Sequence, residues 1–154
     1  MVGRDAELRA VAQFVDRGRG ATAVLVLQGE AGIGKTTVWA AALDVARERG
    51  FRVLVARPVE AEAGLAFTGL ADIVADVLED VGPALPRPQL KALRVALLLD
   101  DADGTPPDER AVGAALRSVL SEVARCGPTL LAIDDVQWLD GASARALALS
   151  LIHI

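Results

Sequence analysis

One stretch of the sequence has the residue types and spacing of a phosphate-binding loop. "GEAGIGKT", residues 29–36, fits the pattern of glycine, four residues, glycine, lysine and then serine or threonine. Its glycines permit the backbone angles and close approach that turn N–H groups toward phosphate oxygens. Lys35 would neutralise the β and γ oxygens of a nucleotide, and the Thr36 hydroxyl would hold Mg²⁺. The alternative is a flexible connection with an incidental lysine.

The neighbouring sequence supports the phosphate-loop interpretation. An apolar run, 22–29, precedes the loop, and a segment of helical character begins near Lys35, so that the positive end of a helix dipole would face the phosphates. Thr37 is more plausible as a helix-packing residue than as a second ligand, although it adjoins the loop. The nucleotide-contacting positions expected here are Gly29, Glu30, Ala31, Gly32, Ile33, Gly34, Lys35, Thr36 and Thr37.

A pair of carboxylates follows a second apolar run. In "TLLAIDD", residues 129–135, Asp134 and Asp135 stand at the C-terminal end of a predicted strand, where parallel α/β sheets place their ligands. Asp134 is the candidate for Mg²⁺, usually through a water, since this ion keeps much of its hydration shell. Asp135 could orient the attacking water. Lys35 and Asp135 are therefore the candidate catalytic residues.

The elements that must position these residues follow from periodicity and from turn residues. Apolar spacing predicts helices and continuous apolar runs predict buried strands, and crossovers this long favour a parallel sheet. Helices are expected at 4–16, 35–49, 66–81, 86–99 and 108–125, and strands at 22–29, 51–57 and 129–134.

Composition limits the possible classes of function. The 154 residues, 53% of them hydrophobic, suffice for one domain, and a net charge of −5 gives no positive surface for nucleic acid. The single cysteine, Cys126, cannot form an internal disulfide and is expected to be a small apolar filler. No signal sequence is evident, and the apolar runs are too short to cross a bilayer. We therefore expect a soluble, cytoplasmic protein that makes no membrane contact.

Four stretches together resemble a known family: "VGRDAELRAV", the loop with its helix, "RPVEAEAGLAFTGLADIV" and "LLAIDDVQWLDGASARALA". The chain resembles the N-terminal domain of STAND-type, AAA+-like P-loop ATPases, as found in large ATP-binding LuxR-type transcriptional regulators. The resemblance implies a P-loop NTPase of three α/β/α layers with a parallel sheet. It also implies that Gly3 and Arg4 pack by the adenine or ribose.

The resemblance implies ATP and Mg²⁺ as ligands, and a slow ATPase at most. Many ATPases of the wider class carry Glu after the Mg²⁺ aspartate, whereas this chain has Asp135, whose carboxylate is one methylene shorter. Slow hydrolysis suits a switch that alternates between ATP and ADP states. DNA contact is expected only from a domain outside this chain, and the full-length protein could self-associate.

The resemblance also implies that the domain is incomplete. Relatives have five parallel strands and a helical lid, so 1–148 is interpreted as a partial domain that is poorly stable and prone to aggregate. The last six residues, "LSLIHI", match a translation of the transposon mosaic end used in sequencing libraries. Residues 149–154 are therefore a candidate non-native tail, the alternative being an ordinary helix end.

The sequence accordingly predicts an ATP·Mg²⁺-binding switch domain of a multidomain signalling ATPase, with the LuxR-type regulator as the favoured context. Three alternatives remain open: an ATPase with rapid turnover, the ATPase module of a cyclase or kinase regulator, and a truncated piece that binds nothing.

Overall fold

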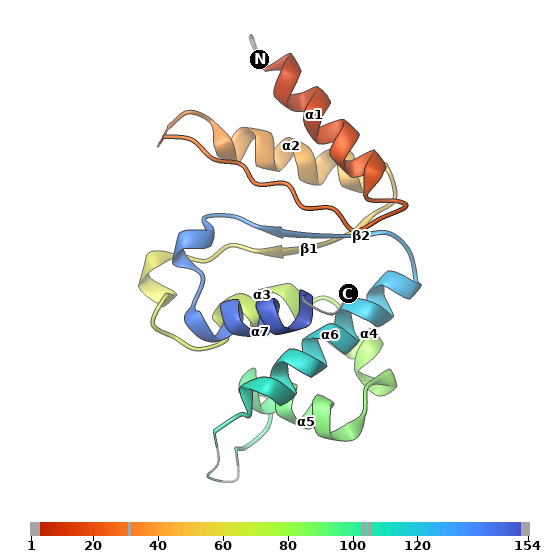
Figure 1. The fold of residues 1–154 in the computed structure, drawn as a ribbon. Helices are drawn as coiled ribbons and strands as arrows, with labels where there is room; N and C mark the ends of the chain where they lie inside the picture. The colour runs from red at the N-terminus through yellow and green to blue at the C-terminus, as the bar shows by residue number, and fades with distance from the viewer. Residues whose placement is uncertain (1–3, 31, 103, 105, 152–154) are drawn as a thin grey trace.

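A computed structural model describes residues 4–30, 32–102, 104 and 106–151. Helices account for most of the ordered elements, and two strands lie between them (Figure 1). In chain order the elements are α1 (Asp5–Arg17), α2 (Lys35–Glu48), β1 (Arg52–Ala56), η1 (Glu60–Glu62), α3 (Thr68–Val74), α4 (Leu78–Val81), η2 (Gly82–Ala84), α5 (Arg87–Ala96), α6 (Glu109–Arg125), β2 (Thr129–Ile133), η3 (Val136–Trp138) and α7 (Gly141–Leu151).

The two strands form a parallel pair, as the long crossovers predicted. Arg52 of β1 pairs with Thr129 of β2, and the register continues to Ala56 and Ile133. The N–H of Asp134 donates to the carbonyl of Ala56 at 3.0 Å, which carries the ladder one residue past β2. The C-terminal ends of both strands therefore meet at one edge of the sheet, where parallel sheets place their ligands.

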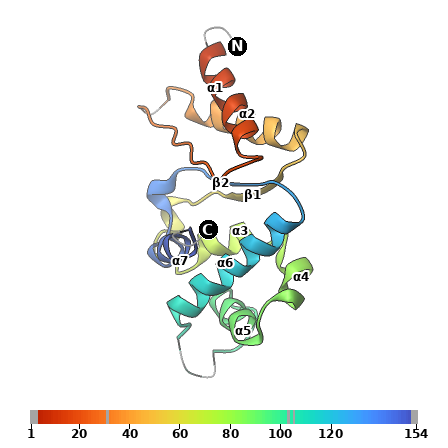
Figure 2. The same ribbon diagram turned by 45° about the vertical axis from the view of Figure 1, so that its right-hand side comes forward.

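Helices cover both faces of this small sheet. Figures 1 and 2 show α1 and α2 on one side and α3 to α7 on the other. The side chains follow the two-residue period of a strand: Val53 and Leu130 pack toward Val15 and Ala46, whereas Leu54 packs into the larger core on the opposite face. The prediction of a mixed α/β fold with a parallel sheet, in the form of a partial P-loop NTPase, is confirmed.

The larger core lies beneath the sheet, among α3, α4, α5, α6 and α7. The apolar face predicted for 66–81 is buried there, and it comprises Leu70, Ile73, Val74, Val77 and Leu78. The single helix expected at 66–81 is instead two, α3 and α4, separated by a turn at 75–77. Both parts keep the same face inward, so the periodicity identified the buried residues although it did not locate the break.

The strand expected at 22–29 is not formed. The segment carries no strand assignment, and Val24 and Val26 are 83% and 67% exposed. A strand requires hydrogen-bonded partners, and β1 and β2 pair only with each other in the described chain. Leu27 alone packs inward, beside Val11, Val38 and Ala42. The expectation of a strand buried on both faces was therefore wrong.

Two expectations about smaller features have different outcomes. Cys126 is exposed at the C-terminal end of α6, so its interpretation as an apolar filler was wrong: the helix has already left the core at that residue. In the proposed non-native tail, residues 149–151 continue α7. Leu149 packs closely against Gly113 of α6, since a Cβ added at Gly113 would lie only 2.9 Å from the Cβ of Leu149. Residues 152–154 lie outside the described residues, so the origin of this tail stays a hypothesis.

Candidate nucleotide-binding site

The predicted phosphate loop is a sharp turn that ends at the start of α2. Gly32 and Gly34 have φ values of 77° and 88°, in the left-handed region that glycine adopts most readily. The N–H of Ile33 donates to the carbonyl of Glu30 at 3.3 Å, and Gly34 is the residue that caps α2. The three spaced glycines and the helix beginning at Lys35 are therefore present as the sequence predicted.

The side chain of Lys35 turns back toward the loop. Its Nζ donates to the carbonyls of Gly29, at 2.9 Å, and Glu30, at 3.0 Å. Both acceptors belong to the first part of the same loop, so these two hydrogen bonds hold the amine against the loop backbone. A cation in this position, beside the N-terminus of a 14-residue helix, creates an electropositive site for phosphate.

A cavity of about 790 Å³ opens in front of the loop. Its lining residues come from two distant parts of the chain: Val26, Leu27, Gln28, Gly29, Gly32, Gly34, Lys35, Thr36, Asp135, Val136 and Gln137. The volume is within the range of sites for small molecules and cofactors. The structure thus brings the phosphate loop and the segment after β2 to one cavity, as predicted from sequence.

Of the two aspartates, only Asp135 lines this cavity. Its backbone is left-handed, with φ of 44°, and its carboxylate accepts the side-chain N–H of Gln137 at 3.0 Å. The carboxylate of Asp134 instead accepts the N–H of Asp135 at 3.1 Å. Asp134 therefore adjoins a cavity-lining residue without lining the cavity itself.

Gln137 is a site residue that the sequence analysis missed. It lines the cavity and is bonded to Asp135, which fixes the direction of that carboxylate. Its position two residues after Asp135, in "DDVQW", was the available signal. The next residue, Trp138, is half-buried at the end of η3.

Arg4 packs on the phosphate loop rather than lining the cavity. Its Nη1 donates to the carbonyl of Gly34 at 3.1 Å. An added Cβ on Gly34 would lie 2.5 Å from the Nη2 of Arg4, so the guanidinium occupies the space that a side chain would need. Arg4 therefore links the start of α1 to the N-terminus of α2, beside the nucleotide site.

Most of the other positions predicted to contact nucleotide do not line the cavity or lie outside the described residues. Glu30, Ile33 and Thr37 are exposed and do not line the cavity. Gly3 and Ala31 lie outside the described residues. Thr36 is exposed and lines the cavity, which leaves its hydroxyl accessible to a cation.

A buried carboxylate, Asp140, holds the segment that follows the cavity. It is 2% exposed, and its Oδ1 accepts the N–H groups of Phe67 and Ser143, both at 2.8 Å. Its Oδ2 accepts the N–H of Gly69 at 3.1 Å. The carboxylate thereby satisfies donors at the starts of both α3 and α7. This role was not predicted from sequence: the bond from Ser143 is local, whereas Phe67 and Gly69 lie 73 and 71 positions away.

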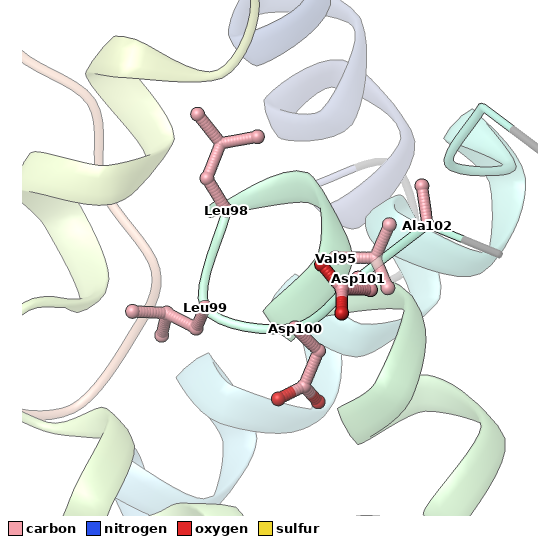
Figure 3. A pocket seen from close by; sticks show the side chains of 6 residues that line it. All are labelled: Val95, Leu98, Leu99, Asp100, Asp101 and Ala102. Atoms are coloured by element: carbon pink, nitrogen blue, oxygen red, sulfur yellow. The ribbon is translucent and has the colours of Figure 1, made fainter. Parts of the chain in front are cut away.

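A second hollow, of about 460 Å³, lies at the end of α5. Figure 3 shows Leu98 and Leu99 projecting away from Asp101 and Ala102 around this turn. Leu98 has a φ of 57° and is 91% exposed. Within the described chain its lining contains two carboxylates and no cation, so it lacks the chemistry of a phosphate site.

The layered α/β fold and the loop cavity together define a nucleotide-binding protein of the P-loop class. The family model described as the AAA ATPase domain matches residues 1–151, so the chain belongs to this family. Membership implies nucleotide binding. Neither the characterised proteins nor the solved structures contain a significant match.

Two further observations apply to the described residues. No helix there is long and apolar enough to cross a membrane. No group of three or more His, Cys, Asp or Glu side chains gathers there as a ready-made metal site.

Proposed function

We propose that this chain is the ATP·Mg²⁺-binding switch domain of a multidomain signalling ATPase, and that the LuxR-type transcriptional regulator is its context. The observation that carries the proposal is the cavity shared by Lys35, Thr36 and Asp135. A cationic amine and a helix N-terminus face a carboxylate across it, which is the charge arrangement needed for a phosphate chain and its cation.

Each residue has a distinct role in this proposal. The loop N–H groups and Lys35 bind the β and γ phosphates, and the Thr36 hydroxyl with Asp134 holds Mg²⁺, the latter through a water. Mg²⁺ held by these residues would supply positive charge to offset that of the phosphates. Asp135, directed by Gln137, positions the attacking water. Arg4 supports the loop from behind and, with Gly3, borders the adenine or ribose.

Slow hydrolysis is part of the proposal. Asp135 has a short side chain that is also bonded to Gln137, and proton transfer requires the carboxylate to reach the water. A rapidly cycling ATPase is the rival function, and steady-state hydrolysis separates the two. A rate well above about one per second would favour the rival, since typical enzymes exceed it. Cyclase or kinase regulators remain alternative contexts for the same module.

Titration with ATP·Mg²⁺ tests the proposal directly. The wild-type chain is expected to bind, and Lys35→Ala is expected to bind at least about tenfold more weakly, because a charge-assisted contact to phosphate is lost. Lys91→Ala, which removes the other lysine of the chain from exposed α5, is the matched control and should bind like wild type. Equal and negligible binding by wild type and Lys35→Ala would reject the function for this chain.

A further inference from the structure

Arg57 and Trp39 form a stacked pair near the ligand edge of the sheet. The Cζ of Arg57 lies 5.2 Å from the centroid of the Trp39 ring, within the range of a cation–π contact. Arg57 directly follows β1, and Trp39 belongs to α2, so the pair connects the far strand with the helix of the phosphate loop.

The indole serves as a platform rather than as a hydrogen-bond donor. The Nε1 of Trp39 is buried and has no hydrogen-bond partner within the described chain. The N–H of a buried tryptophan normally has a hydrogen-bond acceptor. Here the contact that the structure shows is made by the face of the ring. That face is covered by the guanidinium of Arg57.

The guanidinium itself is open to a ligand. Arg57 is exposed, and among the described residues its side chain forms no ion pair. Arg52, at the other end of β1, differs: it donates to Asp80 at 3.2 Å and to the carbonyl of Asp76 at 3.0 Å. A planar guanidinium over an aromatic ring can still use its N–H groups for two parallel bonds to phosphate.

The location of the pair favours a phosphate ligand. Ala56 pairs with Ile133, which places Arg57 level with Asp134 at the C-terminal edge of the sheet. Trp39 follows Lys35 by four residues, so both lie on the same face of α2, about 6 Å apart along its axis. Trp39, with the guanidinium of Arg57 over it, thus lies about one helical turn from Lys35 along α2, beyond the residues that line the cavity.

We propose that Arg57, placed over the ring of Trp39, contacts the terminal phosphate of the bound nucleotide and thereby distinguishes ATP from ADP. This inference rests on the proposed function, because it assigns one more residue to the same site. ADP leaves the Arg57 position without a ligand, whereas ATP supplies an additional phosphoryl group with oxygens for a bidentate contact.

The test compares affinities for a non-hydrolysable ATP analogue and for ADP, both with Mg²⁺. Arg57→Ala should weaken binding of the ATP analogue about tenfold and leave ADP binding within about twofold of wild type. Arg52→Ala is the matched control on the same strand and should change neither affinity. Arg57→Lys keeps the charge without the planar fork, so its loss should be intermediate.

A spectroscopic readout tests the stacking. The chain has two tryptophans, so Trp138→Phe leaves Trp39 as the sole emitter. In that background the ATP analogue should alter Trp39 emission, because the guanidinium over the ring changes its contacts, and ADP should alter it less. Adding Arg57→Ala should abolish the difference between the two nucleotides.

The outcomes separate this inference from the proposed function. Unchanged affinities in Arg57→Ala, or equal losses for both nucleotides, would overturn the role of Arg57 while Lys35-dependent binding still supported the function. Failure of wild type to bind either nucleotide would overturn the proposed function, and this inference with it.

Discussion

The carboxylate of Asp140 accepts the N–H of Phe67 at 2.8 Å, across 73 positions of the chain. Phe67 has a φ of 65°, uncommon for a residue with a Cβ, and the bond from Asp140 holds it there. Since Asp140 stands five residues after Asp135, a movement of the cavity wall would reach the start of α3 through one carboxylate. The segment after β2 is thus connected to both the nucleotide site and the larger core.

Asp140→Ala is expected to lower the free energy of unfolding by about 3 kcal/mol, because it leaves several buried N–H donors unpaired. Urea unfolding followed by circular dichroism measures this. Asp44→Ala is the control: Asp44 forms only an exposed pair with Arg47 within the described chain, so the change should cost less than about 0.5 kcal/mol. Similar losses of unfolding free energy in both variants would contradict the role of Asp140 as the cap of both α3 and α7.

The same carboxylate should make stability fall in acid. Burial opposes the charge of Asp140, but hydrogen bonds from Ser143, Gly69 and Phe67 outweigh burial and hold its pKa below the ordinary 3.8. The stabilisation is therefore complete well above 3.8 and is lost as pH falls through the lower folded-state pKa. The urea midpoint should fall between about pH 5 and pH 2.

Asp140→Asn, which removes the titrating group, should reduce this slope. Some dependence should remain, because Arg94 lowers the pKa of Asp100 and Arg145 lowers that of Glu109, both by hydrogen bonds at the exposed surface. A slope identical to that of wild type would assign the acid sensitivity to those surface pairs.

Substitution of the loop glycines should give graded losses of nucleotide affinity. Gly32→Ala meets no atom within 4 Å but must hold a φ of 77°, which costs about 1–2 kcal/mol. If the free loop relaxes from this conformation, the loss of affinity is about 5- to 30-fold. Gly34→Ala has the same strain and would also displace Arg4, so its loss should be larger. Adding Arg4→Ala to Gly34→Ala should restore only the affinity lost through the clash with Arg4, because the strain of the positive φ remains. Equal losses for both glycines would contradict the close packing of Arg4.

Sequence reasoning succeeded where local chemistry decides the structure. The spaced glycines, Lys35 and the start of α2 form one contiguous turn, whose geometry depends on residues within a few positions of one another. The parallel pairing of β1 and β2 followed from two apolar runs separated by helices. Fold class and loop could thus be predicted from pattern alone.

Sequence reasoning failed where the outcome depends on distant partners. Residues 22–29 have the pattern of a buried strand, but a strand exists only when another chain segment supplies its hydrogen bonds. Asp140 caps α7 locally through Ser143, but its bonds to Phe67 and Gly69 span about 70 positions, which the neighbouring residues do not encode.

The exposed segment should drive self-association. Replacing Val24 and Val26 with Thr is expected to reduce aggregation, measured by light scattering, while changing the free energy of unfolding by less than about 0.5 kcal/mol. Val112→Thr is the control in the core, where Val112 is fully buried, and it should lower stability instead. If light scattering is unchanged in the double variant, another surface mediates self-association, and exposed Leu98 is the next candidate.

Lengthening the carboxylate at the cavity should accelerate hydrolysis. Asp135→Glu adds one methylene, which extends reach toward the attacking water, and we expect a gain of about tenfold over a slow wild-type rate. Asp135→Asn keeps the shape but removes the base, so it should lower the rate. Asp44→Asn, far along α2, is the matched control. The formation of phosphate, bound and free together, during a single turnover measures these rates independently of product dissociation. An equal loss of rate in Asp135→Glu and Asp135→Asn would contradict this prediction. It would mean that the cavity requires a carboxylate of the present length, so the short side chain would not be the cause of slow turnover.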